Sequence, residues 1–65
     1  MKYFEVSFCY APGIYCVNLA RATNPLEVAK HYSGYTWVNI KEVAPEALAG
    51  TLRTADRKGM PIITI

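Results

Sequence analysis

The chain has 65 residues, of which 52% are hydrophobic and 18% are charged, and its formal net charge is +2. This length allows one domain, residues 1–65, and leaves no room for a separate substrate-binding domain. The high apolar content argues against a disordered chain. The weak positive charge argues against a dedicated nucleic-acid binder, because such proteins gain affinity by neutralising several phosphates at once.

Two strands joined by a turn are predicted at the start of the chain. Apolar and polar side chains alternate along residues 2–9, as expected for a strand with one buried face. Pro12-Gly13 marks a turn, and residues 14–22 form the second predicted strand. The side chains expected to face the core from the first strand are Phe4, Val6 and Phe8.

The register of this hairpin depends on the length of its loop. A two-residue turn places Val6 opposite Leu19, whereas a loop of residues 10–13 places Val6 opposite Val17. Both registers keep apolar side chains opposite one another. Because Pro-Gly favours a type II turn, which suits a two-residue hairpin poorly, we favour the longer loop.

A first helix is predicted to begin at Asn24. Asn24 is a favourable cap, Pro25 suits the first helical position, and Glu27 stands three residues after the cap. Gly34 ends this helix. Its apolar side is formed by Leu26, Val28, Ala29 and Tyr32.

Three further elements complete the chain. Residues 35–43 form a third strand, with Val38 and Ile40 facing the core. A second helix runs from Pro45 to about Lys58, and Gly59 ends it. The apolar side of this helix consists of Leu48, Leu52 and Ala55, at helical spacing. Residues 61–65 form the last strand.

The predicted fold is therefore a single small α+β domain of order β-β-α-β-α-β. It contains a mixed four-stranded sheet, because each strand-helix-strand unit should be a right-handed crossover between parallel strands. We expect both helices on one face of this sheet. The first strand lies either at an edge or between the second and third strands, and the sequence leaves both positions open.

Two helices on one face would leave the other face of the sheet open. Exposed aromatic patches often mark binding or self-association. We therefore predict that this face binds a partner protein or a second copy of the chain, with a purely stabilising role as the plainer alternative. The candidate interface residues are Tyr3, Tyr35, Trp37 and Asn39. The full outward-facing set is Tyr3, Glu5, Ser7, Cys9, Cys16, Asn18, Ala20, Tyr35, Trp37 and Asn39.

A basic cluster near the end of the second helix is the second candidate site. Arg53 and Arg57 share a helix face, and Lys58 follows them. These side chains suit an anion or a nucleic acid, in which case aromatic side chains of the sheet would stack on bases. The plainer interpretation is that they complement the negative end of the helix dipole.

The sequence contains few residues for catalysis or metal binding. Cys9 and Cys16 are expected on one face of the hairpin, where they suit either a redox pair or half of a metal site, but ordinary unpaired thiols are the simpler interpretation. His31 is the only histidine, and a surface position near a helix end explains it. No phosphate-binding glycine motif is present. We therefore predict no enzyme activity, no metal and no cofactor.

Two segments carry a general resemblance to known proteins. The opening residues 1–8 (MKYFEVSF) and the closing residues 57–63 (RKGMPII) resemble those of small accessory proteins of bacterial phages and mobile elements. In the general style of these proteins, a strand hairpin leads into a helix and then into another strand. Residues 22–29 followed by residues 38–43 show the same order. The resemblance implies a small accessory or inhibitor protein and assigns no functional residue.

The expected location follows from the absence of targeting signals. No apolar stretch approaches the roughly 18 residues that a membrane-spanning segment needs. No apolar run followed by small residues suggests a secretory signal. We therefore expect a cytoplasmic protein with reduced thiols and no membrane contact.

Overall fold

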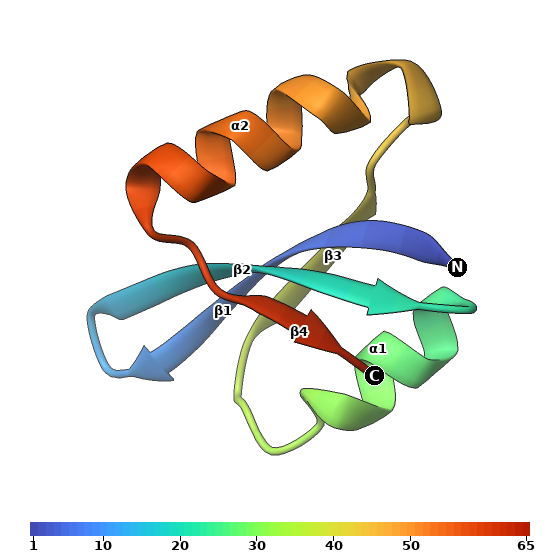
Figure 1. Ribbon diagram of the computed structural model, residues 1–65. Coiled ribbons are helices and arrows are strands. Elements are labelled where there is room, and N and C mark those ends of the chain that lie inside the picture. The colour runs from blue at the N-terminus through green and yellow to red at the C-terminus, as the bar shows by residue number, and fades with distance from the viewer.

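In the computed structural model, which describes Met1 to Ile65, four strands form one mixed sheet in the order β3-β1-β2-β4 (Figure 1). β1 (Lys2–Ala11) is antiparallel to both β2 (Ile14–Ala22) and β3 (Val38–Glu42). β4 (Ile62–Thr64) is parallel to β2 and forms one edge. The first strand therefore lies inside the sheet, between the second and third strands.

The first helix begins and the second helix ends where the sequence predicts, but the first ends at His31, before the expected Gly34, and the second begins at Leu48, after the expected Pro45. α1 (Pro25–His31) is capped by Asn24, whose side chain accepts a hydrogen bond from the Glu27 backbone N–H at 3.0 Å. A 3₁₀ turn (Pro45–Ala47) leads into α2 (Leu48–Lys58). Gly59 ends α2 with a φ of 67°, a left-handed conformation that glycine adopts without strain. The order β-β-α-β-α-β is confirmed.

A one-residue irregularity in β1 sets the register of the hairpin. Ala11 pairs with Ile14 across a two-residue turn, but the register shifts between Cys9 and Ala11. Gly13 has a φ of 79°, as a type II turn requires at its third position. We attribute the shift to the twist of this turn, which fits the strands poorly and is relieved by one extra residue, Tyr10.

Both expected registers are therefore wrong. Val6 lies opposite Asn18, not Val17 or Leu19, because the extra residue moves the pairing by one position. A one-residue shift exchanges the faces of a whole strand. The side chains that share a face with Val6 are thus Phe4 and Phe8 of β1 and Cys16, Asn18, Ala20 and Ala22 of β2.

The two helices lie on opposite faces of the sheet, so the expectation of two helices on one face is wrong (Figure 1). The strand order gives the reason. The connection from β2 to β3 crosses the sheet in one direction, and the connection from β3 to β4 crosses back in the other. Two crossovers of the same hand that run in opposite directions must place their helices on opposite faces.

We call these faces the α1 face and the α2 face. The α1 face carries the main core, in which Val28 and Tyr32 pack on the sheet. The buried cluster consists of Phe4, Val6, Phe8, Ala20, Ala22, Val28 and Tyr32, and the half-buried Val38 and Ile40 pack against it as predicted. The α2 face has a smaller buried centre, formed by Leu19 and Ala55.

Candidate protein-interaction surface

Helix α2 covers the α2 face of the sheet along only part of β2. Leu19, Val17 and Tyr15 point from this face in succession toward the turn of the hairpin, because side chains alternate along a strand. Their exposed fractions are 0%, 39% and 67%. The turn end of the hairpin therefore projects beyond the helix that covers the rest of this face.

Two aromatic rings meet on the uncovered part. The rings of Tyr15 and Trp37 pack edge to face, with centroids 5.8 Å apart and planes at 88°. Cys9 lies between them on β1, an inner strand. It pairs with Tyr15 on one side, and its N–H donates to the Trp37 carbonyl at 3.0 Å on the other. Trp37 is 48% exposed. The pair is thus held by the sheet but open to solvent.

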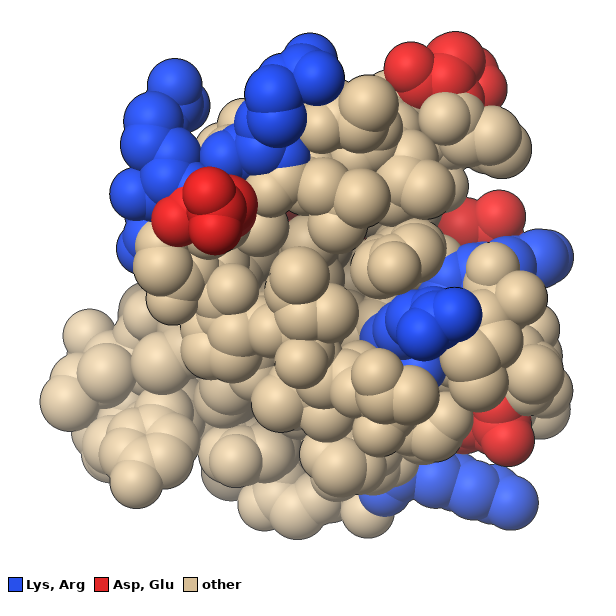
Figure 2. All heavy atoms as spheres, viewed as in Figure 1, with Lys and Arg blue, Asp and Glu red and all other residues tan.

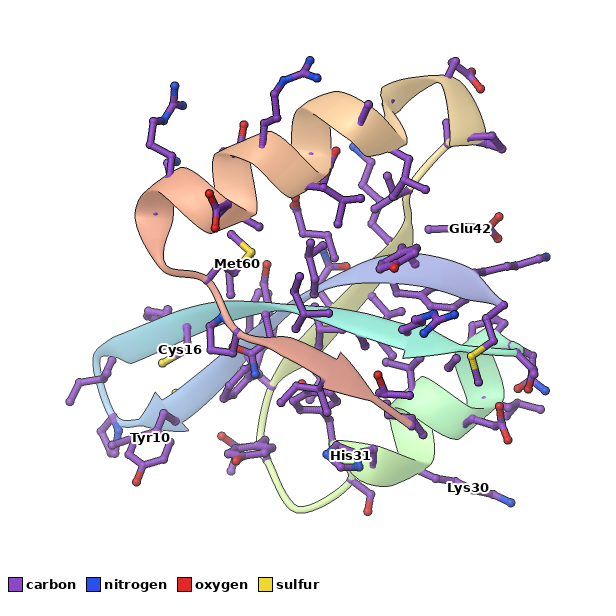
Figure 3. The ribbon with its side chains drawn as sticks, in the orientation of Figure 1. Tyr10, Cys16, Lys30, His31, Glu42 and Met60 are labelled. Carbon is purple, nitrogen blue, oxygen red and sulfur yellow. The ribbon has the colours of Figure 1, made fainter.

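We call Tyr15, Val17 and Trp37, with Cys9 between the rings, the hairpin-end surface. No charged residue occurs between Val6 and Ala20. Figure 2 shows the turn end of the hairpin without a charged side chain in this view, whereas Lys and Arg gather over the C-terminal part of α2. Tyr10 extends the aromatic character at the tip, where it projects outward (Figure 3) and is 67% exposed.

The structure brings together only part of the predicted interface. Trp37 and Asn39 lie on the α2 face, the latter opposite Ser7. Tyr3 shares this face but is half-buried near the other end of β1. Tyr35 lies on the α1 face, where its ring packs against Phe8 with centroids 4.7 Å apart. The expectation that Tyr35 shares an open face with Trp37 is therefore wrong.

Sequence reasoning missed Tyr15 and Val17. The expected register placed Val17 toward the core, and the shift at Tyr10 turns it to the other face. One signal was present in the sequence. The long uncharged stretch through the hairpin is unusual for a strand pair with a solvent-facing side, which ordinarily alternates apolar and polar residues.

The same shift separates the two cysteines. Cys16 pairs with Phe8 and lies on the α1 face, whereas Cys9 lies on the α2 face and donates its S–H to the Ala11 carbonyl at 3.1 Å. Both thiols are free and half-buried. The expectation that they share a face is wrong, and a disulfide between them within one chain is excluded by their opposite directions.

The basic cluster lies on the exposed side of α2. Arg53, Arg57 and Lys58 are all exposed, and the last two stand in the final turn, where they complement the helix dipole. α2 leads through Met60 directly into β4 beside β2, and Met60 lies between the end of the helix and the sheet (Figure 3). The cluster and the hairpin-end surface therefore belong to the same face of the molecule.

The titratable groups show one clear perturbation, at the start of α1. The Thr23 hydroxyl donates to Glu27 Oε1, and the Thr23 N–H donates to the same atom at 3.1 Å. These bonds, the hydroxyl first, lower the pKa of the Glu27 carboxyl below its ordinary value of 4.5. His31, at the end of this helix, is exposed and packs its ring edge-on against Tyr32.

Three further findings concern the chain as a whole. Nowhere do three or more His, Cys, Asp or Glu side chains gather closely enough to hold a metal ion. Neither helix has the length and apolar character needed to cross a lipid bilayer. Comparisons with protein-family models, with characterised proteins and with solved structures give no match to this chain.

Proposed function

We propose that this protein is a non-catalytic protein-interaction module that binds a partner protein through its hairpin-end surface. The observation that supports this most strongly is the exposed Tyr15–Trp37 pair on an uncharged part of the sheet. Tyr and Trp are enriched among the residues that contribute most to binding energy. An exposed apolar patch of this kind has an unfavourable contact with water that a partner would remove.

The mechanism is steric, since the domain covers a surface of its partner. The two rings already pack on each other, and Cys9, which lies between their backbones, belongs to an inner strand of the sheet. Binding therefore orders few additional side chains and loses little conformational entropy. This mode suits a small accessory or inhibitor protein of a phage or mobile element, acting in the cytoplasm, where free thiols stay reduced.

The substitution Tyr15→Ala tests this proposal most cleanly, because Tyr15, at 67%, is the most exposed side chain of the hairpin-end surface and lies beyond the residues of β2 that pair with β4. A partner is first captured from cell extract with the tagged wild-type protein and identified by mass spectrometry. Its affinity for each variant is then measured by calorimetry. We expect Tyr15→Ala and Trp37→Ala each to weaken binding by more than about 1 kcal/mol.

Leu26→Ala is the matched control, because Leu26 is the most exposed large apolar side chain, at 71%, and stands on α1, on the opposite face. It should leave the affinity unchanged. Circular dichroism checks that all three variants fold. Full affinity of folded Tyr15→Ala and Trp37→Ala would contradict the proposal.

A nucleic acid is the second candidate partner, favoured by the basic cluster on the same face. Phosphates would contact Arg53, Arg57 and Lys58 while bases stack on Tyr15 and Trp37. This function predicts binding of single-stranded DNA or RNA that weakens steeply with salt. A labelled oligonucleotide that shows no change in anisotropy at low salt would exclude it.

A further inference from the structure

The two edges of the sheet differ in how well they are protected against pairing with another strand. β4 forms one edge with only three residues and follows Pro61, which has no N–H to donate. β3 forms the other edge with five residues and contains neither proline nor a bulge. Short strands and proline are common protections of sheet edges. β3 lacks both, and its protection is limited to the charged Lys41 and Glu42, so it is more accessible than β4.

The hydrogen bonds of β3 show which of its backbone groups are free. Cys9 donates to the Trp37 carbonyl at 3.0 Å, and Val43 donates to the Tyr3 carbonyl at 2.9 Å. In an antiparallel ladder, alternate residues point their N–H and C=O groups to opposite sides. Since Trp37 and Val43 point toward β1, the backbone groups of Val38, Ile40 and Glu42 point outward, where no further strand lies.

We propose that a second copy of the chain occupies this edge, with the two β3 strands antiparallel and related by a two-fold axis at Asn39. In this register, Val38 lies opposite Ile40 of the second copy, and Lys41 lies opposite Trp37. The two Asn39 side chains meet at the axis, where their amides can donate to and accept from each other. No charged side chain faces a charge of the same sign.

The neighbouring symmetric registers are less favourable. An axis at Ile40 places Val38 opposite the charged Glu42, and an axis at Lys41 places two lysines directly opposite each other. Like charges at directly opposed positions destabilise a strand pair. An axis at Val38 brings no like charges together but leaves only Val38 itself within both strands. Strand overlap and side-chain chemistry together therefore select the axis at Asn39.

The small size of the buried core supports the choice of a second copy. Only nine residues are buried, and nine large apolar side chains are exposed. Chains of this size are marginally stable alone, and oligomerisation is a common remedy. Edge pairing would join two four-stranded sheets into one and cover the outer sides of Val38 and Ile40, which are half-buried in the single chain. It leaves Tyr15 free but places Lys41 of the second copy opposite Trp37, so Tyr15→Ala, which does not touch the β3 edge, is the variant that separates partner binding from dimerisation.

Paired charge variants at the axis test this arrangement. Asn39 is exposed and its side chain forms no hydrogen bond within the chain, so Asn39→Asp and Asn39→Lys should both fold. We expect the wild-type protein to sediment as a concentration-dependent dimer. Each variant should dimerise about fivefold more weakly, because two like charges then meet at the axis. An equal mixture of the two should form a heterodimer, which native mass spectrometry resolves by mass.

A second variant blocks the edge itself. Ile40→Pro removes an N–H that points away from β1, a position at which edge strands tolerate proline, and should abolish the dimer without unpairing β3 from β1. Three results would overturn the proposal. These are a wild-type monomer at every concentration, dimerisation of Asn39→Asp as strong as that of the wild type, and an Asp–Lys mixture without heterodimers.

Discussion

The two faces of the sheet use apolar residues in different ways. On the α1 face, a seven-residue helix closes over a continuous core, in which the large side chains of Phe4 and Val6 are 1% and 0% exposed. On the α2 face, a helix of eleven residues covers Leu19 but leaves Tyr15 and Trp37 in contact with solvent. The longer helix therefore covers its face less completely than the shorter one.

Because of this difference, the side chains that stabilise the fold are not the side chains that are available to a partner. A side chain that is fully buried contributes the free energy of its transfer from water and offers no contact to a partner. An exposed ring contributes little to folding and keeps its apolar area available. The α1 face should therefore dominate the stability of the domain, and the open end of the α2 face should dominate its interactions.

The largest expected effect contrasts one residue from each face. Phe4→Ala should destabilise the domain by about 3–5 kcal/mol through lost burial and a cavity. That is a large part of the roughly 3–10 kcal/mol available to a chain of this size. Trp37→Ala should cost only about 1 kcal/mol, mainly through the lost ring contact with Tyr15. Urea unfolding followed by circular dichroism measures both, and equal losses would mean that the two faces are equally important for stability.

A smaller effect is expected from the one polar contact in the core of the α1 face. Asn18 Nδ2 donates to the Tyr32 hydroxyl at 3.1 Å, and Tyr32 is 3% exposed. Tyr32→Phe removes the acceptor and should destabilise the domain by about 1 kcal/mol. Tyr35→Phe is the control, because the Tyr35 hydroxyl has no hydrogen-bond partner within the chain. Thermal unfolding should separate the two variants, and identical melting temperatures would show that this bond contributes nothing.

The smallest expected effect is a pH dependence at the start of α1. The pKa of Glu27 is lower in the folded chain than its ordinary value of 4.5, so the ionised carboxylate stabilises the fold. This contribution is fully present above that ordinary value and is lost as the pH falls through the folded pKa. Glu27→Gln should therefore be less stable than the wild type at neutral pH, and the difference should shrink in acid. Denaturant titrations at several pH values test this, and a difference that grows in acid would contradict it.

Local chemistry explains why the elements could be predicted. Asn24, Pro25 and Glu27 begin α1 as expected, and Gly59 ends α2. Each of these signals acts within one helical turn, so it does not depend on the rest of the fold. The inward direction of Val38 and Ile40 also followed from alternation along a single strand.

The candidate site was predicted only in part, because it depends on one bulged residue. Trp37 was identified, but its partner ring, Tyr15, was not. The shift at Tyr10 moves Tyr15 and Val17 to the face of Trp37, and it moves Cys16 away from Cys9. A bulge arises from the fit between turn and strand twist, which the alternating pattern of either strand alone does not reveal.

By itself, the sequence determined the class of this domain, the order and type of its elements, and the residues that cap its helices, since these follow from short-range backbone preferences and side-chain periodicity. Only the tertiary structure decided the central place of β1, the opposite placement of α1 and α2, and the part of the sheet that stays open. These features depend on pairing between segments far apart in the chain, where a shift of one residue reverses which side chains are buried.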